Sequence, residues 1–110
     1  MIEPEDDFEP PASMIELVDE SVSTLDGVDR GTDAVATTLS RAGRLFASLT
    51  GDVLDVRLDS MLAGPALRTP DATPSARGAG WIRFAPPLLD RYAVDRVTAW
   101  IGYAWRHALD

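Results

Sequence analysis

The chain has no cysteine, so disulfide bridges, thiolate metal sites and cysteine nucleophiles are all excluded. Its single histidine, His107, argues against a histidine-based metal site. No apolar run approaches the roughly 20 residues that a membrane-spanning helix needs, and the first residues are acidic, unlike those of a signal peptide. We therefore expect a soluble, cytoplasmic protein that uses no metal or other cofactor and does not bind membranes.

Lysine is also absent, and eighteen acidic residues outnumber ten arginines, which gives a formal net charge of −8. A high-GC genome would favour arginine, alanine and aspartate codons, but it would not by itself produce this net charge. A salt-rich cytoplasm would, because a dense carboxylate surface keeps proteins hydrated and apart. The composition therefore favours a halophilic host. It also opposes binding to nucleic acid, unless the arginines cluster on one face.

Motifs of catalysis and nucleotide binding are missing as well. No glycine-rich dinucleotide motif, P-loop or H-E-x-x-H motif occurs. Ser75 has no base close to it in sequence. His107 falls near the end of the last predicted helix, where a protonated histidine interacts favourably with the helix dipole. The sequence therefore predicts no catalytic residue.

The length of 110 residues suits one domain. Residues 1–12, MIEPEDDFEPPA, contain five acids and three prolines. Such a segment cannot bury enough apolar surface to offset the entropy lost on ordering, so we expect a disordered acidic leader. Residues 13–110 then form a single domain.

Two helices are predicted at the ends of this domain. The first begins at Ser13, which forms a capping box with Glu16, and it ends at Gly27. The second runs from a cap at Asp90 to Asp110. Apolar residues recur along both at helical spacing: Met14, Leu17, Val18, Val22 and Leu25 in the first, and Val94, Val97, Ile101, Ala104, Trp105 and Ala108 in the second.

Between the helices, three runs of residues alternate like strands: residues 34–39, 45–50 and 53–58. We predict an antiparallel meander, with room for a further short strand near Val28. The competing interpretation is one helix from Asp33 to Leu49, which the β-branched residues at its start disfavour.

A short helix over residues 59–67 follows, interrupted at Gly64-Pro65, with Met61, Leu62 and Leu67 packed on the sheet. A polar loop then leads to a strand at residues 81–84, whose side chains alternate in pairs. Ile82 and Phe84 are expected to point inward, and Trp81 and Arg83 outward or under the last helix. The predicted fold class is α+β, with a single antiparallel sheet of about four strands and the N-terminal and C-terminal helices packed on it, in the order α-β-β-β-α-β-α.

An arginine and aromatic cluster around this loop and strand is the best candidate site. An exposed tryptophan beside arginines can bind an anionic ligand or the carboxylate of a partner. The alternative is that the arginines pair with local acids such as Asp55, Asp59 and Asp71. The candidate ligand-binding or partner-binding residues are Asp55, Arg57, Arg68, Arg77, Trp81 and Arg83.

Several short motifs occur in the same order as these elements: Gly27-Val28, Gly43-Arg44-Leu45-Phe46, Gly51-Asp52, Asp55-Val56-Arg57-Leu58 and Gly80-Trp81-Ile82, before the closing helix. In this order the chain resembles the small "luciferase domain" family of α+β proteins over residues 14–109. The resemblance implies the meander instead of the long helix. In that family, histidines tend to accompany the middle strand and the loop before the Gly-Trp strand. Here those places hold Ala47, Leu49 and a loop without histidine, so the chain cannot use such histidines in the same way.

The predicted function is a non-catalytic binding or interaction module that uses residues 69–83 to hold an unknown protein or a small anionic ligand. The alternative is a small-molecule-binding or hydrolytic enzyme, with a pocket between the last helix and the sheet and with Asp55, Arg57 and Arg83 orienting the substrate. An exposed sheet edge would also allow a homodimer.

Overall fold

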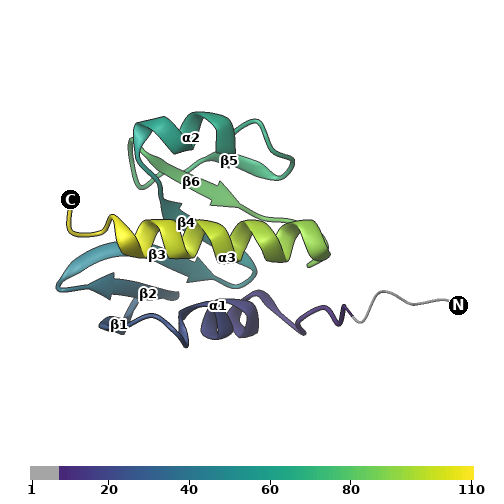
Figure 1. Ribbon diagram of the computed structural model, residues 1–110, viewed down its shortest axis with the longest axis horizontal. Helices are drawn as coiled ribbons and strands as arrows, with labels where there is room; N and C mark the ends of the chain where they lie inside the picture. Colours follow the sequence, from purple (N-terminus) through teal and green to yellow (C-terminus); the bar gives the residue numbers. More distant parts are fainter. Residues whose placement is uncertain (1–7) are drawn as a thin grey trace, which may run out of the picture.

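The computed structural model describes residues 8–110, which form one antiparallel sheet with three helices (Figure 1). Most of the predicted disordered leader, residues 1–12, lies outside the described residues. Of its described part, the ring of Phe8 lies 4.7 Å from the guanidinium carbon of Arg91. The α+β class and the single antiparallel sheet are confirmed.

The sheet has six strands, where about four were predicted. Its spatial order is β1-β2-β3-β4-β6-β5, and every neighbouring pair is antiparallel. The chain order is α-β-β-β-β-α-β-β-α, so the predicted α-β-β-β-α-β-α order is wrong. The strands are β1 (Val28–Asp33), β2 (Ala36–Arg41), β3 (Arg44–Thr50), β4 (Val53–Arg57), β5 (Ala72–Pro74) and β6 (Trp81–Phe84).

The two strands missing from the predicted order, β1 and β5, are the edge strands; β1 is the further short strand that was allowed for near Val28. Residues of β1 after Val28 are all exposed, and β5 is only three residues long. Neither has the apolar alternation that marks a strand in a sequence. Each is held instead by backbone pairing with its one neighbouring strand. The predicted strand at residues 34–39 also begins later, because Ala34, with φ of +57°, and Val35 make the turn between β1 and β2.

The helix α1 (Met14–Val22) begins as predicted, with the Ser13 hydroxyl accepting from the Glu16 amide. In a capping box the Glu16 carboxylate would accept from the amide of the cap residue, Ser13. Here it accepts from the amide of Ala12, one residue earlier. Met14, Leu17 and Val18 are buried, and the helix packs against the last helix. It ends at Val22, so Leu25 lies in the turn that follows.

The helix α2 (Ser60–Ala66) is capped by Asp59 and continues through Gly64-Pro65, so the predicted interruption is wrong. Proline removes one amide donor, a small loss in a helix of seven residues on the surface. With the helix starting at Ser60, Ala63 and Ala66 face the core. Two of the three residues predicted to pack on the sheet, Met61 and Leu67, are therefore exposed, and Leu62 packs against the core only in part.

The helix α3 (Arg91–Arg106) crosses the sheet and is capped by Asp90, whose carboxylate accepts from the Ala93 amide. Its buried face is rotated from the predicted one, so that Trp100 is buried while Trp105 lies at the edge. The Trp105 indole donates to the Asp26 carbonyl instead. No helix among residues 8–110 is long and apolar enough to cross a bilayer.

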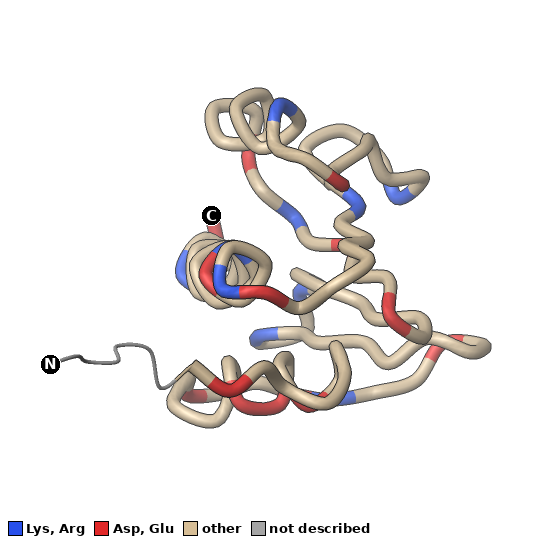
Figure 2. The backbone as a smooth tube through the Cα atoms, turned by 90° about the vertical axis from the view of Figure 1, so that its right-hand side faces the viewer, with Lys and Arg blue, Asp and Glu red and all other residues tan. Residues whose placement is uncertain are grey.

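The core lies between the helices and one face of the sheet, and it contains Ile82 and Phe84 as predicted. In the view of Figure 2, α3 is seen end-on at one side of the sheet, and no helix of the described residues lies on the other side. Asp55 of β4 and Arg83 of β6 are paired in the register, and their sequence neighbours point into the core. Because side chains alternate along a strand, Asp55 and Arg83 lie on the opposite side of the sheet, the helix-free face. Of the two placements predicted for Arg83, outward or under the last helix, the structure has the outward one.

Candidate functional site

A row of polar side chains crosses the helix-free face. The register pairs Ser48 of β3 with Asp55 of β4, and Asp55 with Arg83 of β6. Ser48 and Asp55 are 1% and 3% exposed, although no helix covers them. They are the only buried polar or charged residues among residues 8–110. Because buried polar groups need hydrogen-bond partners, the side chains that cover these two are of special interest.

Asp55 is covered by Arg83, which forms a two-pronged ion pair with it. Arg83 Nε lies 3.1 Å from Oδ1, and Nη2 lies 3.3 Å from Oδ2. The carboxylate side chain is 5% exposed and the arginine side chain 47%. The hydrogen bonds that Arg83 donates to Asp55, together with the charge of that carboxylate, raise the pKa of the Arg83 guanidinium. Arg83 is therefore a fixed cation with one edge facing solvent.

Ser48 is covered by Arg77, which comes from the loop between β5 and β6. Arg77 Nε donates to the Ser48 hydroxyl at 2.9 Å. The guanidinium carbon of Arg77 also lies 5.5 Å from the centre of the half-buried Trp81 ring, in a cation–π contact. Arg77 remains exposed. The loop thus folds back over the sheet and places an arginine on the helix-free face.

The loop that carries Arg77 is itself tied down by backbone contacts. The Arg77 amide donates to the Ser75 hydroxyl, and the Trp81 amide donates to the Gly78 carbonyl. The Gly80 carbonyl accepts from the Leu58 amide at 2.6 Å, which extends the β4–β6 pairing by one step. The position of Arg77 is therefore set by hydrogen bonds on both sides of it.

The charges on this face do not balance. Asp55 neutralises Arg83, whereas Arg77 contacts no carboxylate among the described residues. Its two terminal nitrogens make no hydrogen bond within the described chain, and they remain beside an aromatic ring. A planar guanidinium in this state suits a carboxylate or another small anion.

Four of the six predicted site residues, Asp55, Arg77, Trp81 and Arg83, are brought together here, and the other two are not. Arg57 is opposite Trp81 in the register, but its side chain turns to the Ala108 carbonyl at 3.5 Å. Arg68 follows α2, and its side chain forms no hydrogen bond or ion pair with a described residue. Ser48 was missed, because its place opposite Asp55 depends on a register that sequence does not reveal.

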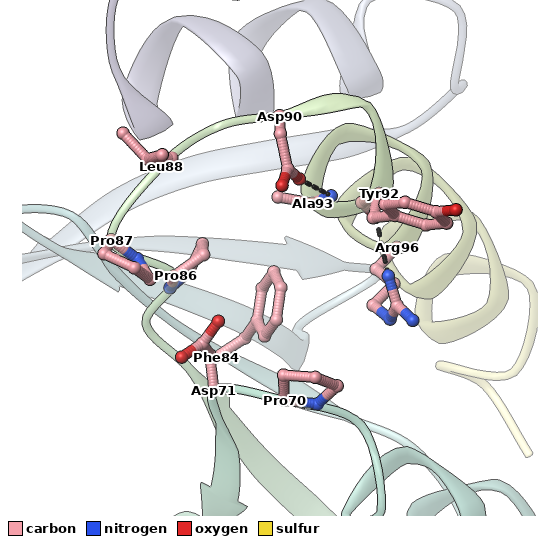
Figure 3. A pocket seen from close by; sticks show the side chains of 10 residues that line it. All are labelled: Pro70, Asp71, Phe84, Pro86, Pro87, Leu88, Asp90, Tyr92, Ala93 and Arg96. Atoms are coloured by element: carbon pink, nitrogen blue, oxygen red, sulfur yellow. Dashed lines mark hydrogen bonds between the residues drawn. The ribbon is translucent and has the colours of Figure 1, made fainter.

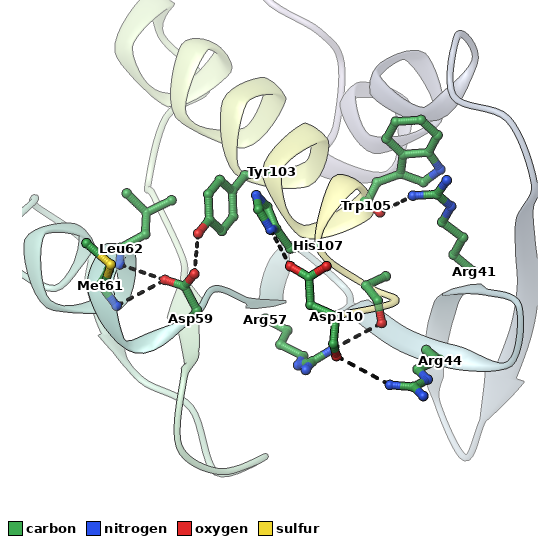
Figure 4. Close-up of polar contacts among 11 residues, drawn as sticks. Arg41, Arg44, Arg57, Asp59, Met61, Leu62, Tyr103, Trp105, His107 and Asp110 are labelled. Atoms are coloured by element: carbon green, nitrogen blue, oxygen red, sulfur yellow. Dashed lines mark hydrogen bonds and ion pairs between the residues drawn. The ribbon is translucent and has the colours of Figure 1, made fainter.

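A second polar cluster lies around the end of α3 (Figure 4). The Tyr103 hydroxyl donates to the carboxylate of Asp59, the residue that caps α2. The Tyr103 ring is stacked on the ring of His107, with centroids 4.3 Å apart. His107 is the C-cap residue of α3, and its Nδ1 lies 2.6 Å from Asp110 Oδ2. A hollow of about 130 Å³ separates these groups from Arg57.

The Tyr103–Asp59 contact predicts a shifted ionisation. The hydrogen bond lowers the pKa of Asp59 and raises the pKa of Tyr103 above its ordinary value of 10.0. A raised pKa means that the stabilisation by the Tyr103 hydroxyl is complete below pH 10 and is lost as pH rises through the folded-state value. In a Tyr92→Phe background, where Tyr103 is the sole tyrosine, phenolate absorbance should show this late ionisation.

The control is Asp59→Asn in the same background, which keeps the helix cap but removes the charge. It should lower the pKa of Tyr103. An unchanged ionisation would show that the Tyr103–Asp59 contact is not formed in solution.

A pocket of about 350 Å³ lies between the start of α3, the end of β6 and the turn before β5 (Figure 3). It is the kind of place proposed for the alternative function, a pocket between the last helix and the sheet. Asp55, Arg57 and Arg83 are not among its lining residues, which include Asp71, Phe84 and Tyr92 instead. The polar row and the pocket are therefore separate features.

No cluster of three metal-ligating side chains was found within residues 8–110. No family model, curated protein or solved structure matches this chain, and the resemblance to the luciferase domain family stays a prediction.

Proposed function

We propose that the chain is a non-catalytic binding module that recognises a carboxylate or similar anionic group on its helix-free sheet face. One observation carries this proposal: both buried polar residues of the described chain hold an arginine in place on that face. Ser48 holds Arg77, and Asp55 holds Arg83. Burying a hydroxyl and a carboxylate is costly, and the result is a pair of oriented guanidinium groups beside Trp81.

The geometry favours recognition over catalysis. The Ser48 hydroxyl is buried and already accepts a hydrogen bond from Arg77, so it is not available as a nucleophile. The Asp55 carboxylate is held on both oxygens by Arg83, which makes it a poor general base. Arg77 has free donors that are already oriented, so binding an anion would cost little side-chain entropy.

The proposal also includes a cytoplasmic location and a salt-rich host, and both rest on the composition of the chain alone. A homodimer through the open edge at β1 would have to bring Asp29 and Asp33 close to a second copy, and charges on an edge strand oppose such pairing.

The proposal predicts binding of simple anionic probes. We expect a tetraglutamate peptide and citrate, titrated separately at low ionic strength, to change the fluorescence of Trp81. The Arg77→Ala/Trp81→Ala double variant should lose at least about tenfold in affinity by calorimetry, since a charge-assisted hydrogen bond contributes about 1.5–3 kcal/mol. Arg77 is exposed and Trp81 is only half-buried, and neither belongs to the core, so the fold should survive.

The matched control is Arg106→Ala, which makes the same charge change on α3, on the other side of the sheet. It should leave the affinity within about twofold. If the double variant and the control bind equally well, or if neither probe binds the wild-type chain, the helix-free face is not an anion site.

A further inference from the structure

The 350 Å³ pocket at the start of α3 is walled mainly by apolar side chains (Figure 3). Pro70 lies on one side, Pro86 and Pro87 on another, and the ring of Phe84 between them. The rim contains Leu88 and Tyr92, each 72% exposed, which are two of the most exposed large hydrophobic residues in the described chain. Exposed apolar groups gathered around a hollow are typical of a ligand site.

The walls are largely rigid before any ligand arrives. The Phe84 ring is 2% exposed and packs edge-on against Trp100, with ring centroids 5.1 Å apart. The three prolines have fixed φ angles. The Ala85 amide donates to the Asp71 carbonyl at 3.0 Å, which joins the turn before β5 to the end of β6. A pre-formed pocket of this kind loses little entropy on binding.

Of the three charged groups in the lining, only the Asp71 side chain makes no hydrogen bond to another described residue. The Asp90 carboxylate caps α3 by accepting from the Ala93 amide. The Arg96 guanidinium donates to the Tyr92 carbonyl and lies over the Tyr92 ring. The Asp71 carboxylate has no hydrogen bond or ion pair with any described residue. Figure 3 shows the Asp71 side chain among those that line the pocket, next to the Phe84 ring in this view.

We propose that this pocket binds a small organic cation, an aromatic ring carrying a protonated amine. The ring would pack on Tyr92 and the prolines, and the ammonium group would bond to Asp71. The volume holds about a dozen water-sized groups, which fits one ring with a short arm. The net charge of −8 attracts cations to the surface. This site differs from the arginine face in place and in the sign of its ligand.

A series of probes with the same ring and different charges tests the proposal. The probes are 2-phenylethylamine, 2-phenylethanol and 3-phenylpropionate, and binding is followed by NMR at the backbone amides of Asp71, Phe84 and Ala93. We expect the amine to bind about tenfold more tightly than the alcohol, as a charge-assisted hydrogen bond requires, and the propionate to bind most weakly. Equal affinities for the three, or no shifts at these amides, would overturn the proposal.

The deciding variant is Asp71→Asn, because asparagine has the same shape and tolerates the φ of +69° found here. It should remove the preference for the amine over the alcohol. Asp33→Asn, which makes the same charge change at the end of β1, should keep the preference. Tyr92→Ala should weaken the amine and the alcohol alike. An amine preference that survives Asp71→Asn would contradict the assignment of the ammonium to Asp71.

Discussion

Gly80→Ala should destabilise the domain by about 3 kcal/mol or more, because this glycine meets two constraints at once. Its φ is +81°, a conformation that costs other residues about 1–2 kcal/mol. A Cβ added there would also lie 2.6 Å from the Leu58 carbonyl oxygen, and relieving such overpacking costs about 1–3 kcal/mol. The oxygen belongs to the backbone of a paired segment, so it cannot simply move away.

The matched control is Gly43→Ala in the turn between β2 and β3. Its φ is +80°, nearly the same, but nothing lies within 4 Å of its added Cβ. It should cost only about 1 kcal/mol. Urea unfolding with an unchanged m value would measure both. Equal losses in the two variants would show that the close approach of Gly80 to Leu58 is absent in solution.

The same glycine bears on the proposed anion site. Gly80 joins the loop that carries Arg77 to the strand that carries Trp81 and Arg83, and its contact with Leu58 fixes where that loop leaves the sheet. A shift of the backbone at this point would move Arg77 away from Ser48. Anion binding should therefore weaken in Gly80→Ala even in conditions where the variant is fully folded.

The helices and the central strands could be predicted because their signals are local. Ser13 and Asp90 mark the helix starts by the side-chain bonds they make within one turn. The alternation of Leu54 and Val56 marks β4 by its own period. By contrast, β1 has no buried alternating residues and exists through pairing with β2, which is a contact with another segment.

The candidate site shows the same division. Alternation alone predicted that Trp81 and Arg83 share one face of a strand, and it left open whether that face points outward or lies under the last helix. It could not place Ser48 or separate Arg57 from Asp55, because both depend on register and on where α3 ends. The pocket could not be predicted from the sequence for a similar reason: Pro70 and Tyr92 are far apart in sequence and line the same pocket only in the folded chain.

The Asp55–Arg83 pair leads to the second large effect, in which the two partners are not equivalent. Asp55 is 5% exposed at its side chain and Arg83 47%, so only the arginine can recover solvent when its partner is removed. The pair joins two neighbouring strands inside the sheet, β4 and β6, neither of which is an edge strand. Its loss should therefore depend strongly on which residue is replaced.

Arg83→Met should cost about 2–3 kcal/mol, because it leaves a buried carboxylate without its partner. This is less than for a fully buried pair, since water can approach the space that the half-exposed arginine vacates. Asp55→Val should cost less than about 1 kcal/mol, since Arg83 is free to turn to solvent and valine suits a strand. The double variant should come within about 1 kcal/mol of the wild-type chain or exceed it, because an apolar pair of similar volume needs no desolvation of charge. Urea unfolding of all four proteins, analysed as a double-mutant cycle, measures these differences. If Asp55→Val proves as costly as Arg83→Met, then the cost of Arg83→Met does not come from leaving the buried Asp55 carboxylate without a partner.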